Sequence, residues 1–236
     1  SRVFALLFNV IRNLIAGYPV DFLTVVAQVL SVLFVIFAIL PLHEFAHAWV
    51  ATKLGDPTPK WDGRLTLNPL VSIDPMGAGM LLLFGFGWAK PVQVNARNFK
   101  KPKRDMAITA LAGPVSNLLA ALVGAIILTA VAVFAPYNTV VLFIYNVLYY
   151  YVIVNVTLAV FNLLPIPPLD GSRILGAFLS DRALYNYYRY QQYFIIGLYV
   201  LMFTGALSGP LGWLQSLFGN AIFWVAELPF KLFGVL

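Results

Sequence analysis

Five long apolar segments alternate with short polar stretches along the chain. They cover about residues 22–53, 106–135, 138–163, 190–207 and 211–235. A membrane-spanning helix needs roughly 20 mostly apolar residues, and each segment approaches or exceeds that length. The pattern therefore predicts an α-helical polytopic membrane protein with about five to six transmembrane helices.

Residues 64–94 follow a different pattern. Arg64–Pro69 alternates between polar and apolar positions, glycines and prolines follow, and residues 90–94 alternate again. Alternation with glycine and proline punctuation is typical of a β-hairpin. We therefore expect a small membrane-associated β-hairpin or sheet at about 64–94. Because unpaired backbone is unstable against lipid, this region must be covered by protein, lie at the interface, or be re-entrant and line a water-filled cavity.

The first 17 residues carry Arg2 and Arg12 around an apolar stripe. No small-residue cleavage site follows them, so the pattern does not fit a signal peptide. We interpret residues 1–17 as an interfacial amphipathic segment. With no internal repeat, linker or second soluble domain in the pattern, residues 1–236 are expected to form a single transmembrane unit.

Composition and charge support a membrane environment. The chain is 61% hydrophobic and 10% charged, whereas a typical soluble domain is about 25% charged. The net charge of +6 depends on one short loop, which contains Arg97, Lys100, Lys101, Lys103 and Arg104. Positive loops between membrane segments mark the cytoplasmic side, so we expect this loop to contact the lipid bilayer and not nucleic acid. The absence of cysteine excludes disulfides and thiolate metal sites.

The sequence His43-Glu44-Phe45-Ala46-His47 lies near the end of the first apolar segment. Histidines four residues apart share one face of a helix, where both rings can bind one metal ion. Glu44 can then act as a general base toward a metal-activated water. Ionisable groups at membrane depth are costly and mark function by default. The alternative is a hydrogen-bonded polar cluster between helices.

A catalytic zinc ion takes three protein ligands and keeps one open position. The chain has no further histidine and no cysteine, so the third ligand must be a carboxylate. We favour Asp170, which follows a proline-rich break after an apolar segment. Its alternative role is to cap a helix that begins near Ser172. Glu227, in the last apolar segment, is the competing carboxylate.

These motifs resemble those of the site-2 protease family of intramembrane zinc metalloproteases. Residues 43–47 fit the family pattern HExxH, and residues 162–171 fit N-x-x-P-x-P-x-L-D-G. Two further stretches, residues 63–69 and 112–117, also fit. The resemblance covers nearly the whole chain and implies a minimal form without a PDZ or nucleotide-sensing domain.

The resemblance also implies roles for individual residues. His43, His47 and Asp170 would bind one Zn²⁺ per chain, and Glu44 would be the catalytic acid and base. Asn117 and Asn162 would take part in substrate or oxyanion binding, with a helix–helix hydrogen bond as the alternative for both.

The implied activity is hydrolysis of peptide bonds in or near transmembrane segments of membrane-anchored proteins. The expected substrate is a single-span transmembrane protein or a leftover signal peptide. The expected location is a prokaryotic cytoplasmic membrane, with the active site toward the cytoplasmic side. Two alternatives stay open: another membrane zinc protease with a glutamate as third ligand, and a non-catalytic metal-binding membrane protein.

Overall fold

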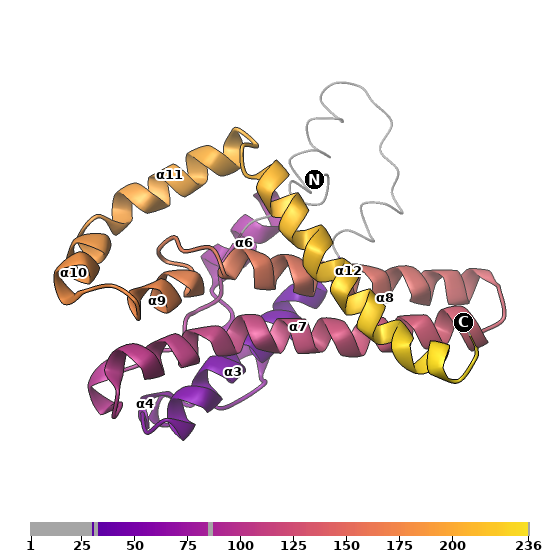
Figure 1. Ribbon diagram of the computed structural model, residues 1–236, viewed down its shortest axis with the longest axis horizontal. Coiled ribbons are helices and arrows are strands. Elements are labelled where there is room, and N and C mark those ends of the chain that lie inside the picture. The colour runs from indigo at the N-terminus through magenta and orange to yellow at the C-terminus, as the bar shows by residue number, and fades with distance from the viewer. Residues whose placement is uncertain (1–29, 31–32, 85–86, 236) are drawn as a thin grey trace.

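The computed structural model describes residues 30, 33–84 and 87–235. The interfacial segment predicted at residues 1–17 and part of the first apolar segment lie outside this range. The described residues form helices joined by loops, and none of them belongs to a β-strand longer than a single bridge (Figure 1).

Three of the described helices are long and apolar enough to cross a membrane. The first combines a π-helical stretch, η1 (Val35–Ile39), with α3 (Leu40–Lys53). The other two are α7 (Pro102–Phe134) and α8 (Thr139–Asn162). At about 1.5 Å per residue, the 33 residues of α7 span about 50 Å, and the hydrocarbon core of a bilayer is only about 30 Å thick. The ends of α7 therefore extend into the interfacial regions.

The remaining C-terminal helices are shorter or more polar. They are α9 (Asp170–Gly176), α10 (Asp181–Arg189), α11 (Gln191–Phe203) and α12 (Ser208–Leu232). The predicted segment at 190–207 becomes α11, which has only 13 residues. The segment at 211–235 lies within or just beyond α12, where Gln215 and Asn220 interrupt the apolar run. The described residues thus support an α-helical membrane protein, but the predicted five to six spans are not confirmed.

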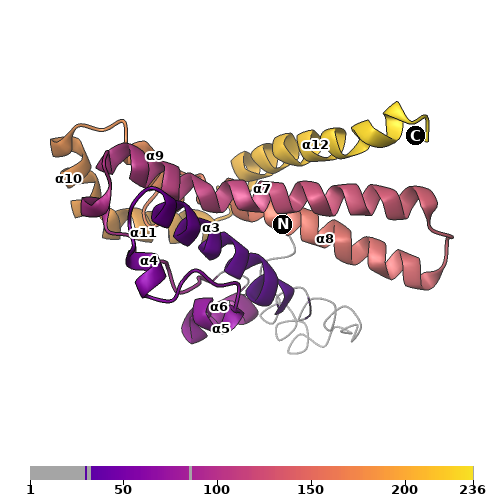
Figure 2. The same ribbon diagram turned by 90° about the horizontal axis from the view of Figure 1, so that it is seen from below.

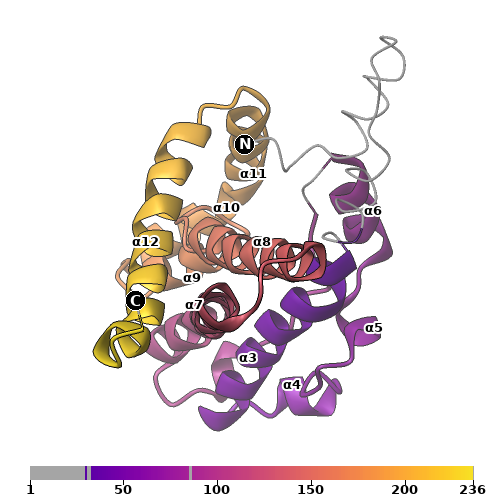
Figure 3. The same cartoon turned by 90° about the vertical axis from the view of Figure 1, so that its right-hand side faces the viewer.

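Helix α7 lies at the centre of the fold and contacts α3, α8, α9 and α12. Figure 3, which looks along the α7–α8 pair, shows α12 on one side and α3 on the other, and Figure 2 shows α9 and α10 gathered near one end of α7. Small residues make this packing close. A Cβ at Gly124 would lie 2.6 Å from the ring of Tyr151 on α8. The buried core continues through six residues of α7, α8 and α12: Ala121, Ala125, Val152, Val156, Val160 and Ala226.

The β-hairpin predicted for residues 64–94 is not confirmed. The described residues in this range contain two helices, α5 (Pro69–Ser72) and α6 (Pro75–Phe84). Each begins at a proline, whose fixed φ and missing N–H suit the first position of a helix. The apolar run after Pro75 forms a helix, so the polar–apolar alternation at Arg64–Pro69 did not indicate the structure of the residues that follow it.

The two ends of the 64–94 region nevertheless meet. A single antiparallel bridge joins Ile73 to Ala89, and the amide of Lys90 donates to the carbonyl of Ser72 at 2.8 Å. The buried guanidinium of Arg64 donates to the carbonyls of Val71 and Lys90. These bonds hold the extended residues that follow, 90–95, in a fixed position relative to the rest of the chain.

The loop after α3 fixes the same segment from its other end. Asp56 is buried and follows α3, just before the short helix α4 (Thr58–Trp61). Its carboxylate accepts hydrogen bonds from the amide of Asn95 and from the side chain of Asn98, both at 2.7 Å. Asn98 ends the 3₁₀ turn η2 (Ala96–Asn98). Residues 90–98 are thereby tied to Arg64 and Ser72 at one end and to Asp56, between α3 and α4, at the other.

Candidate active site

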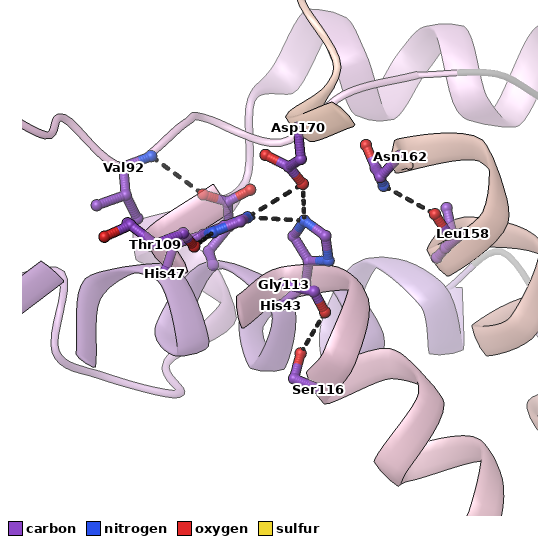
Figure 4. A network of polar contacts seen from close by, with 10 residues as sticks. His43, His47, Val92, Thr109, Gly113, Ser116, Leu158, Asn162 and Asp170 are labelled. Atoms are coloured by element: carbon purple, nitrogen blue, oxygen red, sulfur yellow. Dashed lines mark hydrogen bonds and ion pairs between the residues drawn. The ribbon is translucent and has the colours of Figure 1, made fainter. Parts of the chain in front are cut away.

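His43, His47 and Asp170 converge at one point (Figure 4). The two Nε2 atoms lie 3.0 Å apart. Asp170 Oδ2 lies 3.2 Å from Nε2 of His43 and 3.3 Å from Nε2 of His47. Both histidines are buried, and the structure brings together residues that are far apart in the chain.

Helix α7 supplies the wall behind the histidines. The carbonyl of Thr109 accepts a hydrogen bond of 2.8 Å from Nδ1 of His47, which leaves Nε2 of that ring with a free lone pair. Gly113, one turn further, packs directly against both rings: a Cβ there would lie 2.4 Å from Nε2 of His47 and 2.6 Å from Nε2 of His43. No role for Thr109 or Gly113 was predicted from the sequence. A glycine within the motif at residues 112–117, in the middle of an apolar helix, could have indicated close packing at Gly113.

Asp170 is placed by the start of α9. It is the first residue of that helix, whose N-cap is Leu169, so Asp170 does not cap a helix beginning near Ser172. Gly171 allows the close approach to the end of α8, because a Cβ there would lie 2.2 Å from the carbonyl oxygen of Leu163. Burial favours the neutral Asp170 carboxyl, but its contacts with His43 and His47 lower its pKa below the usual value.

The geometry fits a zinc ion. A tetrahedral ion with bonds of about 2.0–2.1 Å holds its ligand atoms about 3.3–3.4 Å apart, and the three separations here are 3.0, 3.2 and 3.3 Å. Asp170 Oδ2 has no hydrogen-bond partner among the described residues although it is buried. Two imidazole nitrogens and a carboxylate oxygen facing one another are a set of donors that a bound cation would stabilise. Two histidines and a carboxylate are also a ligand set of catalytic zinc.

Glu44 lies beside this cluster in the sequence and is held by a backbone donor. Its Oε2 accepts a 3.0 Å hydrogen bond from the amide of Val92, shown as a dashed line in Figure 4. Val92 belongs to the extended residues 90–95 that Arg64 and Asp56 fix in place. Sequence reasoning missed Val92, because a backbone amide leaves no mark in the residue type.

The two predicted asparagines are less closely connected to the cluster. Asn117 is fully buried on α7, one turn beyond Gly113, and neither polar atom of its side chain has a partner among the described residues. Asn162 ends α8 and donates from Nδ2 to the carbonyl of Leu158 at 3.0 Å, away from the histidines in Figure 4. Within the described residues, no hydrogen bond joins either asparagine to His43, His47 or Asp170.

Glu227 is committed elsewhere. Its Oε2 pairs with Nζ of Lys231 at 2.7 Å on α12. It does not belong to the metal-binding group, and among the described residues no second group of three such side chains is found. The geometry therefore favours Asp170 over Glu227 as the third carboxylate.

Comparison with known proteins agrees with this kind of site. A sequence model of peptidase family M50 matches residues 131–205, a range that includes Asn162 and Asp170 but not the two histidines. The chain is 45% identical over 139 residues to "Putative zinc metalloprotease YwhC" of Bacillus subtilis, covering 57% of this chain and 62% of YwhC. It is 33% identical over 172 residues to "Putative zinc metalloprotease Rip2" of Mycolicibacterium smegmatis, covering 71% of this chain and 64% of Rip2.

An archaeal relative is more distant. "Putative zinc metalloprotease MJ0611" of Methanocaldococcus jannaschii is 32% identical over 135 residues, which cover 56% of this chain and 62% of MJ0611. The chain thus spans somewhat less than two thirds of the length of these relatives. No solved structure matches it.

The chain combines a buried cluster of two histidines and an aspartate that could hold a metal ion with three described helices that are long and apolar enough to cross a membrane. The partial match to the family model and the named relatives support membership of peptidase family M50, the site-2 protease family. The names of its relatives and the chemistry of the three ligands support zinc as the metal.

Proposed function

We propose that the chain is an intramembrane zinc metalloprotease that cleaves peptide bonds in or near transmembrane segments of membrane-anchored proteins. The observation that carries this proposal is the convergence of Asp170, at the start of α9, with His43 and His47 on a helix long and apolar enough to cross a membrane. Glu44 follows the first histidine directly and supplies the acid–base group that peptide hydrolysis requires.

In this proposal His43, His47 and Asp170 hold the zinc ion. Zinc, when bound, lowers the pKa of a coordinated water to about 7 and polarises the carbonyl of the scissile bond. Glu44 accepts the proton of the attacking water and then delivers it to the leaving amine. The hydrogen bond from the Val92 amide holds Oε2, so Oε1 is the oxygen free to move the proton.

Substrate binding is assigned to the extended residues 90–95. A transmembrane helix has its carbonyls bonded internally, so it must unwind before hydrolysis. Pairing with an extended backbone would satisfy the freed groups of the substrate. Asn117 stays a candidate donor toward substrate or the oxyanion because its Nδ2 has no partner among the described residues. Asn162 is the weaker candidate because its Nδ2 already bonds to Leu158.

The proposed setting is a prokaryotic cytoplasmic membrane with the active site toward the cytoplasm. The basic residues just before and at the start of α7 support this orientation by the positive-inside rule. A single-span transmembrane protein or a signal peptide is the proposed substrate.

The test measures zinc content and cleavage of a single-span substrate on the same detergent-purified preparations. Wild type is compared with Asp170→Ala, Glu227→Ala and Glu44→Gln. We expect about one zinc per chain in wild type and Glu227→Ala, and loss of both zinc and activity in Asp170→Ala. Glu44→Gln should keep its zinc and lose at least about 100-fold in rate, the usual scale for a missing general base.

Each result separates one part of the proposal. Zinc retained in Asp170→Ala but lost in Glu227→Ala would replace Asp170 with the competing carboxylate. Cleavage at the wild-type rate by zinc-loaded Glu44→Gln would refute its acid–base role. Wild-type protein that holds zinc but cleaves no membrane substrate would favour the non-catalytic alternative.

A further inference from the structure

A groove lies on the side of α7 opposite the metal-binding cluster. It has a volume of about 770 Å³ and is formed by the first turns of α7 and the end of α9. On α7, Thr109 and Gly113 face the histidines, whereas Ile108 and Leu111 line the groove. The volume lies within the range of about 300–1,000 Å³ that is usual for small-molecule sites. The groove is therefore separate from the proposed active site.

The groove has one apolar and one basic part. Its apolar walls are Ile108, Leu111, Ile174 and Phe178. The first two are about two-fifths exposed and Phe178 is 82% exposed. Large apolar side chains left this open need a nonpolar occupant. The part formed by the start of α7 is lined by Lys101, Lys103 and Arg104. Asp181 is the one carboxylate in the lining, and Asp105, which does not line the groove, pairs with Arg104.

The three cations are not equally available. Nζ of Lys103 pairs with Asp181 at 2.7 Å and donates to the carbonyl of Leu179, which ties the start of α7 to the segment after α9. Arg104 pairs with Asp105 and keeps its side chain more than half exposed. The backbone amide of Lys101 donates to Asp105, and its ammonium makes no hydrogen bond or ion pair among the described residues, although its charge acts on the Asp105 carboxylate. Lys101 and Arg104 can thus bind an anion without breaking the contact that closes the groove.

The position of the groove indicates the class of ligand. Helix α7 is longer than a bilayer core is thick, and the groove surrounds its first turns, where a membrane-spanning helix leaves the hydrocarbon. A peptide would find few backbone groups to pair with, because most of the lining belongs to helices with internally bonded backbones. A molecule with an anionic head and an apolar tail matches both parts of the lining.

We propose that this groove binds one anionic phospholipid, with its phosphate at Lys101 and Arg104 and an acyl chain along Ile108, Leu111 and Phe178. The lipid bridges α7 to α9. Since Thr109 and Gly113 belong to α7 and Asp170 to α9, the bound lipid stabilises the two helices that form the metal-binding cluster. The lipid site itself does not depend on the proposed proteolysis.

The experiment is native mass spectrometry of the whole detergent-purified chain, titrated with palmitoyl-oleoyl phosphatidylglycerol or the matching phosphatidylcholine. Wild type should retain phosphatidylglycerol at least about fivefold more tightly than phosphatidylcholine, since one cation near an anionic lipid contributes about 1 kcal/mol. Lys101→Glu should abolish this preference. Lys100→Glu is the matched control: it makes the same charge change at the neighbouring residue, which does not line the groove, and should alter retention less than twofold.

A second pair of variants tests the apolar part. Ala177→Trp fills the groove, whereas Ala183→Trp adds the same ring at an exposed position on α10. Phosphatidylglycerol should raise the unfolding temperature of wild type and Ala183→Trp but not of Ala177→Trp. The unfolding temperature without lipid shows whether a variant is folded; if Ala177→Trp is not, the two lysine variants decide alone.

Three results would overturn the proposal. Equal losses in Lys100→Glu and Lys101→Glu would show diffuse attraction of anionic lipid to the basic loop. Equal stabilisation by inorganic phosphate would show that the site takes the head group alone. Retention of phosphatidylcholine as tight as that of phosphatidylglycerol would remove the role of the cations.

Discussion

Gly113 offers the sharpest test of the metal-binding geometry. Replacing it with alanine places a Cβ 2.4 Å from Nε2 of His47, 2.5 Å from Cε1 of His43 and 2.6 Å from Nε2 of His43. Ordinary van der Waals contact begins at 3.4 Å, so the nearest ring must move by about 1 Å or α7 must retreat from α3. Metal–ligand distances tolerate only about 0.2 Å of change. We therefore expect Gly113→Ala to weaken zinc binding at least about 100-fold.

The substitution has an opposite effect on the helix itself. Alanine in a helix interior is about 1 kcal/mol more favourable than glycine, so part of the cost of the clash is offset in the metal-free protein. Loss of zinc with an unfolding temperature close to that of metal-free wild type would thus mark a local effect at the histidines. The control is Gly219→Ala on α12, where a Cβ meets nothing within 4 Å.

The assay is zinc competition with a fluorescent chelator, run on wild type and both glycine variants in the same detergent. Gly219→Ala should bind zinc as wild type does. A zinc affinity of Gly113→Ala within threefold of that of wild type would refute the reasoning. The positions of the His43 and His47 rings would then not require a residue without a Cβ at 113.

Two further changes test the supports of the site. Val92→Pro removes the amide that donates to Glu44 and should lower the cleavage rate about tenfold with zinc retained. Val92→Ala keeps the amide and should keep most of the activity. Equal cleavage rates in the two variants would contradict this role of the amide. Asp56→Ala should lower the free energy of unfolding by about 2 kcal/mol at neutral pH, with exposed Asp62→Ala as control. Burial raises the pKa of Asp56, but its hydrogen bonds, including that from Asn98, lower it below the usual value, so its stabilisation is present above about pH 4 and is lost as the pH falls further. A wild-type advantage over Asp56→Ala that does not shrink between pH 7 and pH 3 would show that the charge is not involved.

The sequence was most informative where the chemistry is local. Two histidines four residues apart must share a helix face, and elimination left few carboxylates to complete the set, so His43, His47 and Asp170 could be named before the fold was known. The structure brings the three together, and their role as ligands stays a prediction. The contribution of Gly113 could not be derived in the same way, because it depends on how closely α7 approaches α3.

The sequence was least informative where one pattern fits two structures. Alternation at Arg64–Pro69 suggested a strand, but Pro69 and Pro75 each begin a helix. Apolar length likewise did not define the helices: among the described residues, the segment at 190–207 contains the 13-residue helix α11. Local composition does not reveal where tertiary contacts end a helix.

The order of the ligands along the chain has a consequence for biosynthesis. His43 and His47 emerge from the ribosome early, whereas Asp170 follows only after α7 and α8 have been made. Until then the nascent chain holds only two of the three residues of the cluster, even after α7 has supplied Gly113. A polypeptide cut short before α9 therefore lacks Asp170, and the three-residue cluster can form only after α7 and α8 have been made.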